Sequence, residues 1–320
     1  MKKVLILFGG NSFEHEISCK SVNFIVDNID TKKFNFKLVG IDFDNSWYEI
    51  KNIVNIDKNW KDNEINKIDN IIQYSKKFDI VFPMIHGNTC EDGKLQSIFE
   101  LYHIKYVGCD SYSSLICYDK LLTKLFLEKH SIPQVPYIVY SDNTNLSGIE
   151  YPVIVKPCKC GSSIGINVAH NKKELKKYLK IAFKYDKNII IEKFISNNRE
   201  LECAILKNKK EYIISNVGEI INNGYWYDFD SKYISQNNTI ISNIDNKIKE
   251  EIRTYSKKIF NILGCKDISR IDFLYDIDSK RLYFNEINTM PGFTEISMYP
   301  KLINNEGIDF KEIITKLLSI

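Results

Sequence analysis

The sequence predicts an amino-terminal α/β domain with a parallel sheet, followed by two smaller α+β domains. Three observations lead to this prediction. Strand-like and helix-like segments alternate through the first hundred residues, a polar and turn-rich stretch covers 141–148, and two strand-like segments succeed each other near the carboxyl end. A length of 320 residues is also about twice that of a typical single domain.

Each predicted element follows from an apolar pattern. We expect strands at 4–8, 36–43 and 78–87, and a helix with one apolar face at 16–28. Farther along, we expect helices at 119–130 and near 246–262, and strands at 151–157, 188–194, 270–276 and 281–288. Ligands gather beyond the carboxyl ends of parallel strands, where Gly9-Gly10 and His86-Gly87 fall.

The composition is that of an ordinary globular protein. Lys and Arg number 44 against 41 Asp and Glu, and this balance, a formal charge of +3, offers little affinity for nucleic acid. No apolar run approaches the roughly 20 residues that cross a bilayer, so no membrane partner is expected. The eight cysteines are too sparse for a disulfide framework and predict reduced thiols in a cytoplasmic protein.

A loop of glycine and serine follows the strand at 151–157. Gly161 and Gly165 would let the backbone approach a polyphosphate, and the serines between them offer hydroxyls. Lys156 would add a positive charge from the end of the strand. The spacing is not that of a P-loop, and a glycine hairpin with solvated serines explains these residues equally well.

Acidic and amide side chains alternate along the last two predicted strands. Arg270 and Asp272 share one face of their strand, as do Glu286 and Asn288. If the strands pair antiparallel, three oxygen ligands converge, which suits Mg²⁺ that is also held by phosphate. Cross-strand charge pairing is the alternative, but four such positions beside the turn at Pro291-Gly292 favour a metal site.

Two further segments are less specific. The segment around Glu14, directly after the first strand, would present backbone N–H groups to an anion and a carboxylate to an amine, or would simply cap a helix. Lys232 and Tyr233 lie in a polar stretch that would cover a closed site and hold a carboxylate, or would form an ordinary exposed loop.

Taken in order, eight segments resemble the D-alanine–D-alanine ligase family of ATP-grasp enzymes. They run from Gly9 to Pro300 and are GGNSFEHEIS, HGNTCEDGKLQ, VGCDSYSSLICYDK, KPCKCGSSIGI, IEKF with RELE, YDFDSKY, SRIDF and NEINTMPGFTEISMYP. The resemblance implies an ATP-grasp fold with domains at 1–119, 120–210 and 211–320, ATP between two antiparallel sheets, and a closing loop at about 222–238.

The resemblance also implies a reaction and its cofactors. Two D-alanines and ATP would give D-alanyl-D-alanine, ADP and phosphate through an acyl phosphate, for peptidoglycan synthesis. Two Mg²⁺ ions, or Mn²⁺ in their place, would be held by Asp272, Glu286 and Asn288. Arg270 and the N–H of Gly292 would hold the tetrahedral oxyanion. By family analogy the protein would be a homodimer.

Position by position, the resemblance assigns the remaining site residues. Those expected at the two D-alanines are Glu14, His86, Ser162, Lys232, Tyr233, Ser297 and Met298. Those expected at ATP are Lys120, Lys156, Ser163, Glu192, Lys193, Ile195 and Glu200. Glu14, Ser162 and Tyr233 would form a hydrogen-bonded set, and Glu192 would be an acid on the adenine side.

The chain departs from the family pattern at a few positions. Cys90 and Ser97 stand where glycine is usual, and one extra residue separates Glu192 from Glu200. Some segments are also similar to vancomycin-resistance ligases, which use D-serine or D-lactate as second substrate. The Lys232-Tyr233 pair argues against D-lactate, and the apolar Met298 favours D-alanine over D-serine.

Two other functions are less consistent with these residues. A non-catalytic nucleotide-binding relative would lack part of the set Asp272, Glu286, Asn288 and Arg270, but all four are present. A ligase for L-amino acids is disfavoured by the Glu14 segment and by the Lys-Tyr loop.

Overall fold

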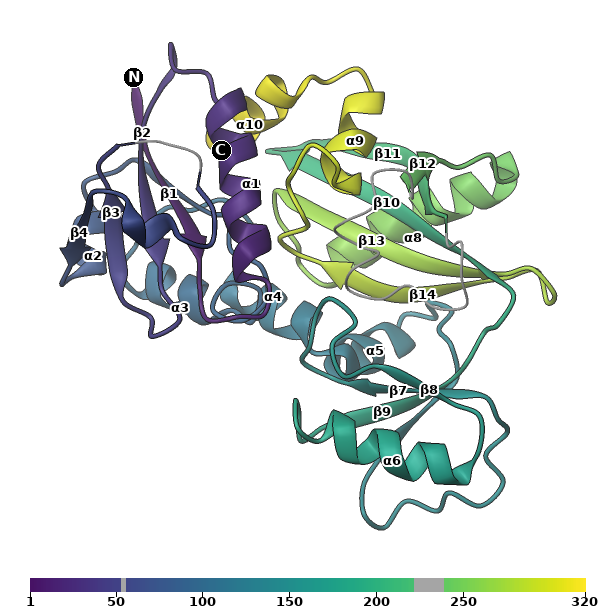
Figure 1. Cartoon of the computed structure of the whole chain (residues 1–320). Coiled ribbons are helices and arrows are strands. Elements are labelled where there is room, and N and C mark those ends of the chain that lie inside the picture. The colour runs from purple at the N-terminus through teal and green to yellow at the C-terminus, as the bar shows by residue number, and fades with distance from the viewer. Residues whose placement is uncertain (53–55, 222–238) are drawn as a thin grey trace.

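The computed structural model describes residues 1–52, 56–221 and 239–320, and these form three sheets with helices around them (Figure 1). The first sheet has the order β4-β3-β2-β1-β5. Its strands are β1 (Lys2–Gly9), β2 (Phe34–Ile41), β3 (Trp47–Ile50), β4 (Ile65–Ile68) and β5 (Ile80–Pro83). The predicted parallel pairing is confirmed for β1, β2 and β5, whereas β3 and β4 add an antiparallel edge that the sequence analysis missed.

Helices cover this sheet and lead away from it. They are α1 (His15–Asn28), the short 3₁₀ turn η1 (Trp60–Asp62), α2 (Ile71–Ser75), α3 (Lys94–Leu101), α4 (Ser111–Tyr118) and α5 (Lys120–Glu128). The single helix predicted at 119–130 is therefore α5, which begins directly after α4. Asp119 separates the two because its side chain accepts the N–H groups of Leu121 and Leu122 as the N-cap of α5.

The second sheet is small and antiparallel, with the order β6-β9-β7-β8. Its elements are β6 (Tyr137–Tyr140), β7 (Val153–Pro157), β8 (Asn167–Ala169), α6 (Lys172–Ala182) and β9 (Ile189–Lys193). Val153, Val155 and Ile191 pack with the apolar side of α6 in one core cluster. Because side chains alternate along a strand, Ile154 and Lys156 of β7 point to the opposite face.

The third sheet is antiparallel, with the order β12-β11-β10-β13-β14. Its elements are β10 (Asn198–Asn208), β11 (Glu211–Ile220), β12 (Thr239–Ile241), α8 (Asn246–Ile262), β13 (Ile268–Asp276) and β14 (Arg281–Asn288). The predicted domain boundary at residue 210 falls between two neighbouring strands of this sheet, since β10 pairs with both β11 and β13. The chain passes from the second sheet to the third between β9 and β10.

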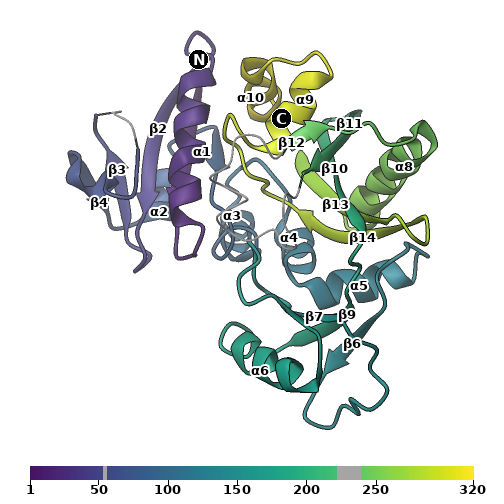
Figure 2. The ribbon, with the colours of Figure 1, turned by 45° about the vertical axis from the view of Figure 1, so that its right-hand side comes forward.

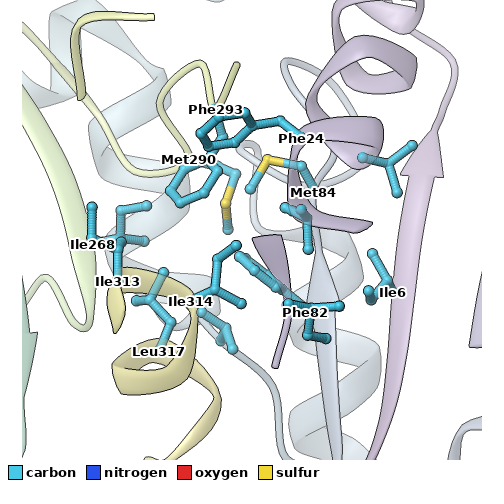
Figure 3. Close-up of a cluster of buried hydrophobic side chains, with 14 of the residues drawn as sticks. Ile6, Phe24, Phe82, Met84, Ile268, Met290, Phe293, Ile313, Ile314 and Leu317 are labelled. Carbon is cyan, nitrogen blue, oxygen red and sulfur yellow. The ribbon is translucent and has the colours of Figure 1, made fainter. Parts of the chain in front are cut away.

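An apolar cluster joins the first sheet to the carboxyl-terminal helices α9 (Met298–Asn305) and α10 (Phe310–Leu318). Figure 3 shows Phe24 and Phe82 of the amino-terminal part close to Phe293, and the ring centroids are 6.0 and 6.2 Å from that of Phe293. Figure 2 shows α1 beside α10. The turn before α9 is thus held in place by buried apolar contacts. No helix in the described ranges combines the length and apolar composition of a membrane span.

Candidate active site

Two adjoining pockets open between the sheets and contain most of the predicted site residues. The first is lined by Glu14, His86, Ser162, Arg270, Asp272, Asn288, Gly292, Ser297 and Met298. The second is lined by Lys120, Lys156, Ser163, Glu192, Lys193 and Ile195. Glu200 and Glu286 line both. Lys232 and Tyr233 lie outside the described residues.

Glu14 comes directly before α1, but its side chain does not cap that helix. Its carboxylate instead accepts a hydrogen bond of 2.5 Å from the Ser162 hydroxyl, across the first pocket. A Cβ atom at Gly87 or Gly161 would lie 2.7 or 2.8 Å from Glu14 Oε2, so both positions require glycine for this approach. The contact that the resemblance implies between Glu14 and Ser162 is therefore present.

His86 links the first sheet to the turn before α9. It is buried, its Nε2 is 2.9 Å from the Ser21 hydroxyl, and its Nδ1 is 2.9 Å from the Met290 carbonyl. Burial lowers the pKa of His86, although the nearby Glu14 carboxylate acts in the opposite direction. His86 is therefore a neutral ring at physiological pH, and it positions the backbone just ahead of Gly292.

Glu91 is a site residue that the sequence analysis did not single out, although it lies within the HGNTCEDG segment. Its carboxylate accepts the N–H groups of Gly87 at 2.9 Å and Met290 at 3.2 Å. Burial, together with the charge of Glu14, raises the pKa of Glu91 to about 8. Glu91, like His86, thus connects the loop after β5 to the turn before α9.

Arg270 is held in the first pocket by two carboxylates. Its Nε and Nη2 donate to Asp272 at 2.8 and 2.7 Å, and its Nε is 3.0 Å from Glu202 Oε2. Burial alone would lower the pKa of Arg270, but Asp272 and Glu202 raise it well above its ordinary value. Glu202 was not predicted, although it stands two residues after Glu200 on β10 and so shares its face.

The expected metal ligands lie together on β13 and β14. The antiparallel pairing is confirmed, with Asp272 opposite Glu286 and Arg270 opposite Asn288. The Asn288 amide nitrogen donates to Asp272 at 3.1 Å. The described residues contain no group of three His, Cys, Asp or Glu side chains that would bind a metal unaided. Asp272, Glu286 and Asn288 offer two carboxylates and one amide oxygen, which are ligands of the kind that Mg²⁺ takes together with phosphate oxygens.

The second pocket is positively charged on one side. Lys120 Nζ donates to the Cys160 carbonyl at 2.7 Å and is 3.8 Å from Glu286 Oε2, at the border of the two pockets. Lys156 Nζ is 2.5 Å from Glu192 and 3.2 Å from the Asn285 amide oxygen. Ser162 and Ser163 have φ angles of 51° and 59°, so the loop between the pockets is a tight turn with left-handed residues.

Glu192 lines the second pocket and belongs to an ion-pair network that was not predicted from the sequence. Its other oxygen is 2.7 Å from the ammonium group of Lys124, a buried residue of α5. Burial alone would raise the pKa of Glu192, but Lys156 and Lys124 lower it to about 2. The carboxylate is thus ionised and held from two sides.

The far end of the first pocket is formed by the start of α9. Ser297 precedes this helix, and its hydroxyl accepts the Thr294 N–H at 3.0 Å. Met298 is buried against Gly218, where an added Cβ would lie 2.6 Å from the Met298 sulfur. The wall of the pocket at this point is apolar.

The departures from the family pattern are accommodated by packing. Cys90 is buried, and its thiol lies 3.5 Å from the Pro83 carbonyl and 3.4 Å from the Gln96 amide nitrogen. The Ser97 hydroxyl donates to the Gly93 carbonyl within α3's first turn at 2.9 Å. The extra residue before Glu200 lies in the connection from β9 to β10, where Asn197 donates to Asp278 at 2.6 Å. Glu200 still lines both pockets.

Comparisons with known proteins agree with this geometry. The family models described as D-ala D-ala ligase N-terminus and D-ala D-ala ligase C-terminus match residues 3–109 and 126–319. A D-alanine–D-alanine ligase of Acetivibrio thermocellus is 38% identical over 100% of this chain and 95% of its own length. D-alanine–D-alanine ligase B of Clostridium tetani is 39% identical over 99% of this chain and 93% of its own length.

A solved structure is similar over almost the whole fold. The VanG D-Ala:D-Ser ligase of Enterococcus faecalis has a TM-score of 0.88 and is 31% identical, covering 99% of this chain and 98% of its own. The three-sheet architecture is thus the predicted ATP-grasp fold, with a mixed rather than purely parallel first sheet. From these matches, which include full-length relatives well above 30% identity, the chain belongs to the D-alanine–D-alanine ligase family.

Proposed function

We propose that this protein uses ATP to join two D-alanines into D-alanyl-D-alanine, a building block for peptidoglycan. The observation that carries the proposal is the position of Glu286. It borders both the pocket that holds the Glu14–Ser162 pair and the pocket lined by Lys120 and Lys156. An amino acid in the first pocket and a nucleoside triphosphate in the second would therefore meet at this carboxylate.

The residues of the first pocket fit the two substrates. The ammonium group of the first D-alanine would bind Glu14, and its carboxylate would attack the γ-phosphate, so that ADP leaves and an acyl phosphate forms. The amine of the second D-alanine then attacks the acyl carbon, and phosphate leaves. Arg270 and the Gly292 N–H would hold the oxyanion of that step, and Ser297 the second carboxylate. Tyr233 and Lys232, by family resemblance, would complete the set.

The residues of the second pocket fit ATP. Lys120 and Lys156 would bind its phosphates, Ser163 would add backbone and hydroxyl contacts, and Glu200 would bind the ribose. Glu192, Lys193 and Ile195 would lie on the adenine side. Two Mg²⁺ ions held by Asp272, Glu286 and Asn288 would neutralise charge on the transferred phosphoryl group, and Mn²⁺ has the same preference for oxygen ligands.

Phosphate release and product mass test this proposal directly. The protein is incubated with ATP, Mg²⁺ and D-alanine, and then with D-alanine plus D-serine. Release on D-alanine alone, with D-alanyl-D-alanine as product, is the expected result. Absence of nucleotide turnover with either substrate would contradict the proposal.

The alternative second substrate is D-serine, because the VanG D-Ala:D-Ser ligase is similar over almost the whole chain. The apolar wall formed by Met298 favours D-alanine, since it suits a methyl group and offers no partner to a hydroxyl. A sharp rise in phosphate release with D-serine, together with a mixed dipeptide, would establish the alternative.

We expect Met298→Arg to shift the preference for the second substrate toward D-serine by about tenfold. The guanidinium would add hydrogen-bond donors where the pocket is now apolar. Ratios of kcat/KM for the two amino acids measure the shift, and Met298→Leu, which keeps the wall apolar, is the matched control. An unchanged ratio in Met298→Arg would show that Met298 does not set specificity.

We also propose a homodimer, in line with the family resemblance. Exposed apolar side chains occur on three successive helices, α3, α4 and α5, and are Ile98, Leu101, Tyr112, Leu115, Leu122 and Leu125. A second copy of the chain would remove this surface from water. Light scattering after gel filtration should give the mass of two chains, and the mass of one chain would contradict the proposal.

The eight free cysteines support a location in the reducing cytoplasm.

A further inference from the structure

A buried lysine outside the nucleotide pocket contacts a carboxylate inside it. Lys124 Nζ is 2.7 Å from Glu192 Oε1, and Lys156 Nζ is 2.5 Å from Glu192 Oε2. Lys156 and Glu192 line the pocket, whereas Lys124 reaches Glu192 from behind, from α5. Figures 1 and 2 both show α5 beside the sheet that carries β7 and β9.

The charges of this group are arranged in the order Lys, Glu, Lys and are almost fully removed from water. The side chains of Lys124 and Glu192 are each 3% exposed, and that of Lys156 is 9% exposed. A buried carboxylate is costly unless each oxygen has a partner, and Lys124 supplies the second partner. Burial lowers the pKa of Lys124, while the Glu192 carboxylate acts in the opposite direction. The Tyr137 ring, whose centre lies 4.9 Å from the ammonium group, also favours the charged form.

The network leaves a net charge of +1 at the wall of the pocket. An ammonium group has three N–H donors. Glu192 and Asn285 accept from Lys156 on the protein side, so that its third donor is available to an anion in the pocket. Without Lys124, the pair of Glu192 and Lys156 would be neutral, and Glu192 would draw the Lys156 ammonium more strongly toward itself.

We propose that Lys124 is a positioning residue for the polyphosphate of the nucleotide, because it neutralises Glu192 and thereby leaves the charge of Lys156 to the phosphates. This inference rests on the proposed function, since it takes the second pocket to be the ATP site. The alternative is that the ion pairs only anchor α5 to the sheet. The two roles predict different effects of removing Lys124. If Lys124 positions the phosphates, its loss weakens the binding of phosphate-bearing ligands selectively. If it only anchors α5, its loss weakens the binding of all ligands and lowers the stability of the protein.

The experiment compares three variants with the wild-type protein: Lys124→Met, Glu192→Gln and the double variant. Calorimetry with Mg²⁺ measures the affinity for a non-hydrolysable ATP analogue and, by competition, for adenosine, which lacks phosphates. Lys129→Met, an exposed lysine directly after α5, is the matched control. The KM values for ATP and for D-alanine are measured in parallel.

We expect Lys124→Met to weaken the ATP analogue about tenfold, the scale of one charge-assisted contact, and adenosine less than about threefold. The double variant restores a net charge of +1, so its ratio of analogue affinity to adenosine affinity should lie within about threefold of the wild-type ratio. The ratio is compared because Glu192 also lines the adenine side, and its loss there would affect both ligands alike. The KM for ATP should rise in Lys124→Met and the KM for D-alanine should not. Lys129→Met should bind both ligands as the wild type does.

Other outcomes overturn the inference. Equal weakening of the analogue and adenosine, or no weakening of either, would leave Lys124 with a purely structural role. If Lys124→Met does not fold, the inference is tested by comparing the affinities of Glu192→Gln and of the double variant for the analogue. They should bind the analogue equally, because Lys124 would act only through Glu192, and a tenfold difference would contradict this. A wild-type protein that binds no analogue would refute the proposed function as well.

Discussion

Replacing Glu286 with Gln is expected to slow phosphate release from ATP about 1,000-fold or more while the protein stays folded. Glu286 lies opposite Asp272, borders both pockets and is 3.8 Å from Lys120 Nζ. Gln keeps the size of the side chain but removes the negative charge that a divalent cation requires. Initial rates with saturating ATP, Mg²⁺ and D-alanine measure the loss.

The fold should tolerate this change because the ion pair of Glu286 and Lys120 is long and the Glu286 side chain is 27% exposed. Thermal unfolding checks that point. Glu251→Gln, on the exposed side of α8, removes the same charge away from both pockets and should turn over normally. Normal turnover in Glu286→Gln itself would rule out the proposed metal site.

The face that carries Asp272, Glu286 and Asn288 was predictable because it depends on local rules. Side chains two residues apart on a strand share a face, and strands that follow each other closely usually pair antiparallel. The pairing of β13 with β14 confirms both expectations. The Glu14–Ser162 contact was different, because it joins segments far apart in the chain and only the family resemblance suggested it.

The features that were missed depend on long-range contacts or on weak local patterns. The Lys124–Glu192 ion pair joins α5 to β9, and nothing in either segment alone marks the partner of the other. Likewise, Glu91 gains its role from backbone groups of two separate segments. Strands β3 and β4 are four residues each and form the antiparallel end of the first sheet, with β4 at its edge. Their sequences are too short to carry much of the apolar pattern that identifies buried strands.

Replacing Arg270 with Lys is expected to lower kcat about 100- to 1,000-fold with little change in nucleotide affinity. Arg270 binds Asp272 through two parallel contacts and also reaches Glu202, and this planar arrangement fixes the guanidinium toward the first pocket. Lysine keeps the positive charge, so the two buried carboxylates retain a cation. A single ammonium group, however, cannot reproduce the two parallel contacts of the guanidinium with Asp272. Steady-state phosphate release gives kcat, and calorimetry with the ATP analogue gives the affinity.

The exposed Arg281 at the start of β14 provides the matched control. Arg281→Lys makes the same chemical change outside the pockets, so kcat should stay at its wild-type value. The size of the Arg270→Lys effect discriminates between two roles. A loss confined to kcat means that the guanidinium acts on charge that develops during the reaction, because ground-state binding is unchanged. Equal losses in kcat and in ATP affinity would instead show that Arg270 mainly maintains the shape of the site through Asp272 and Glu202.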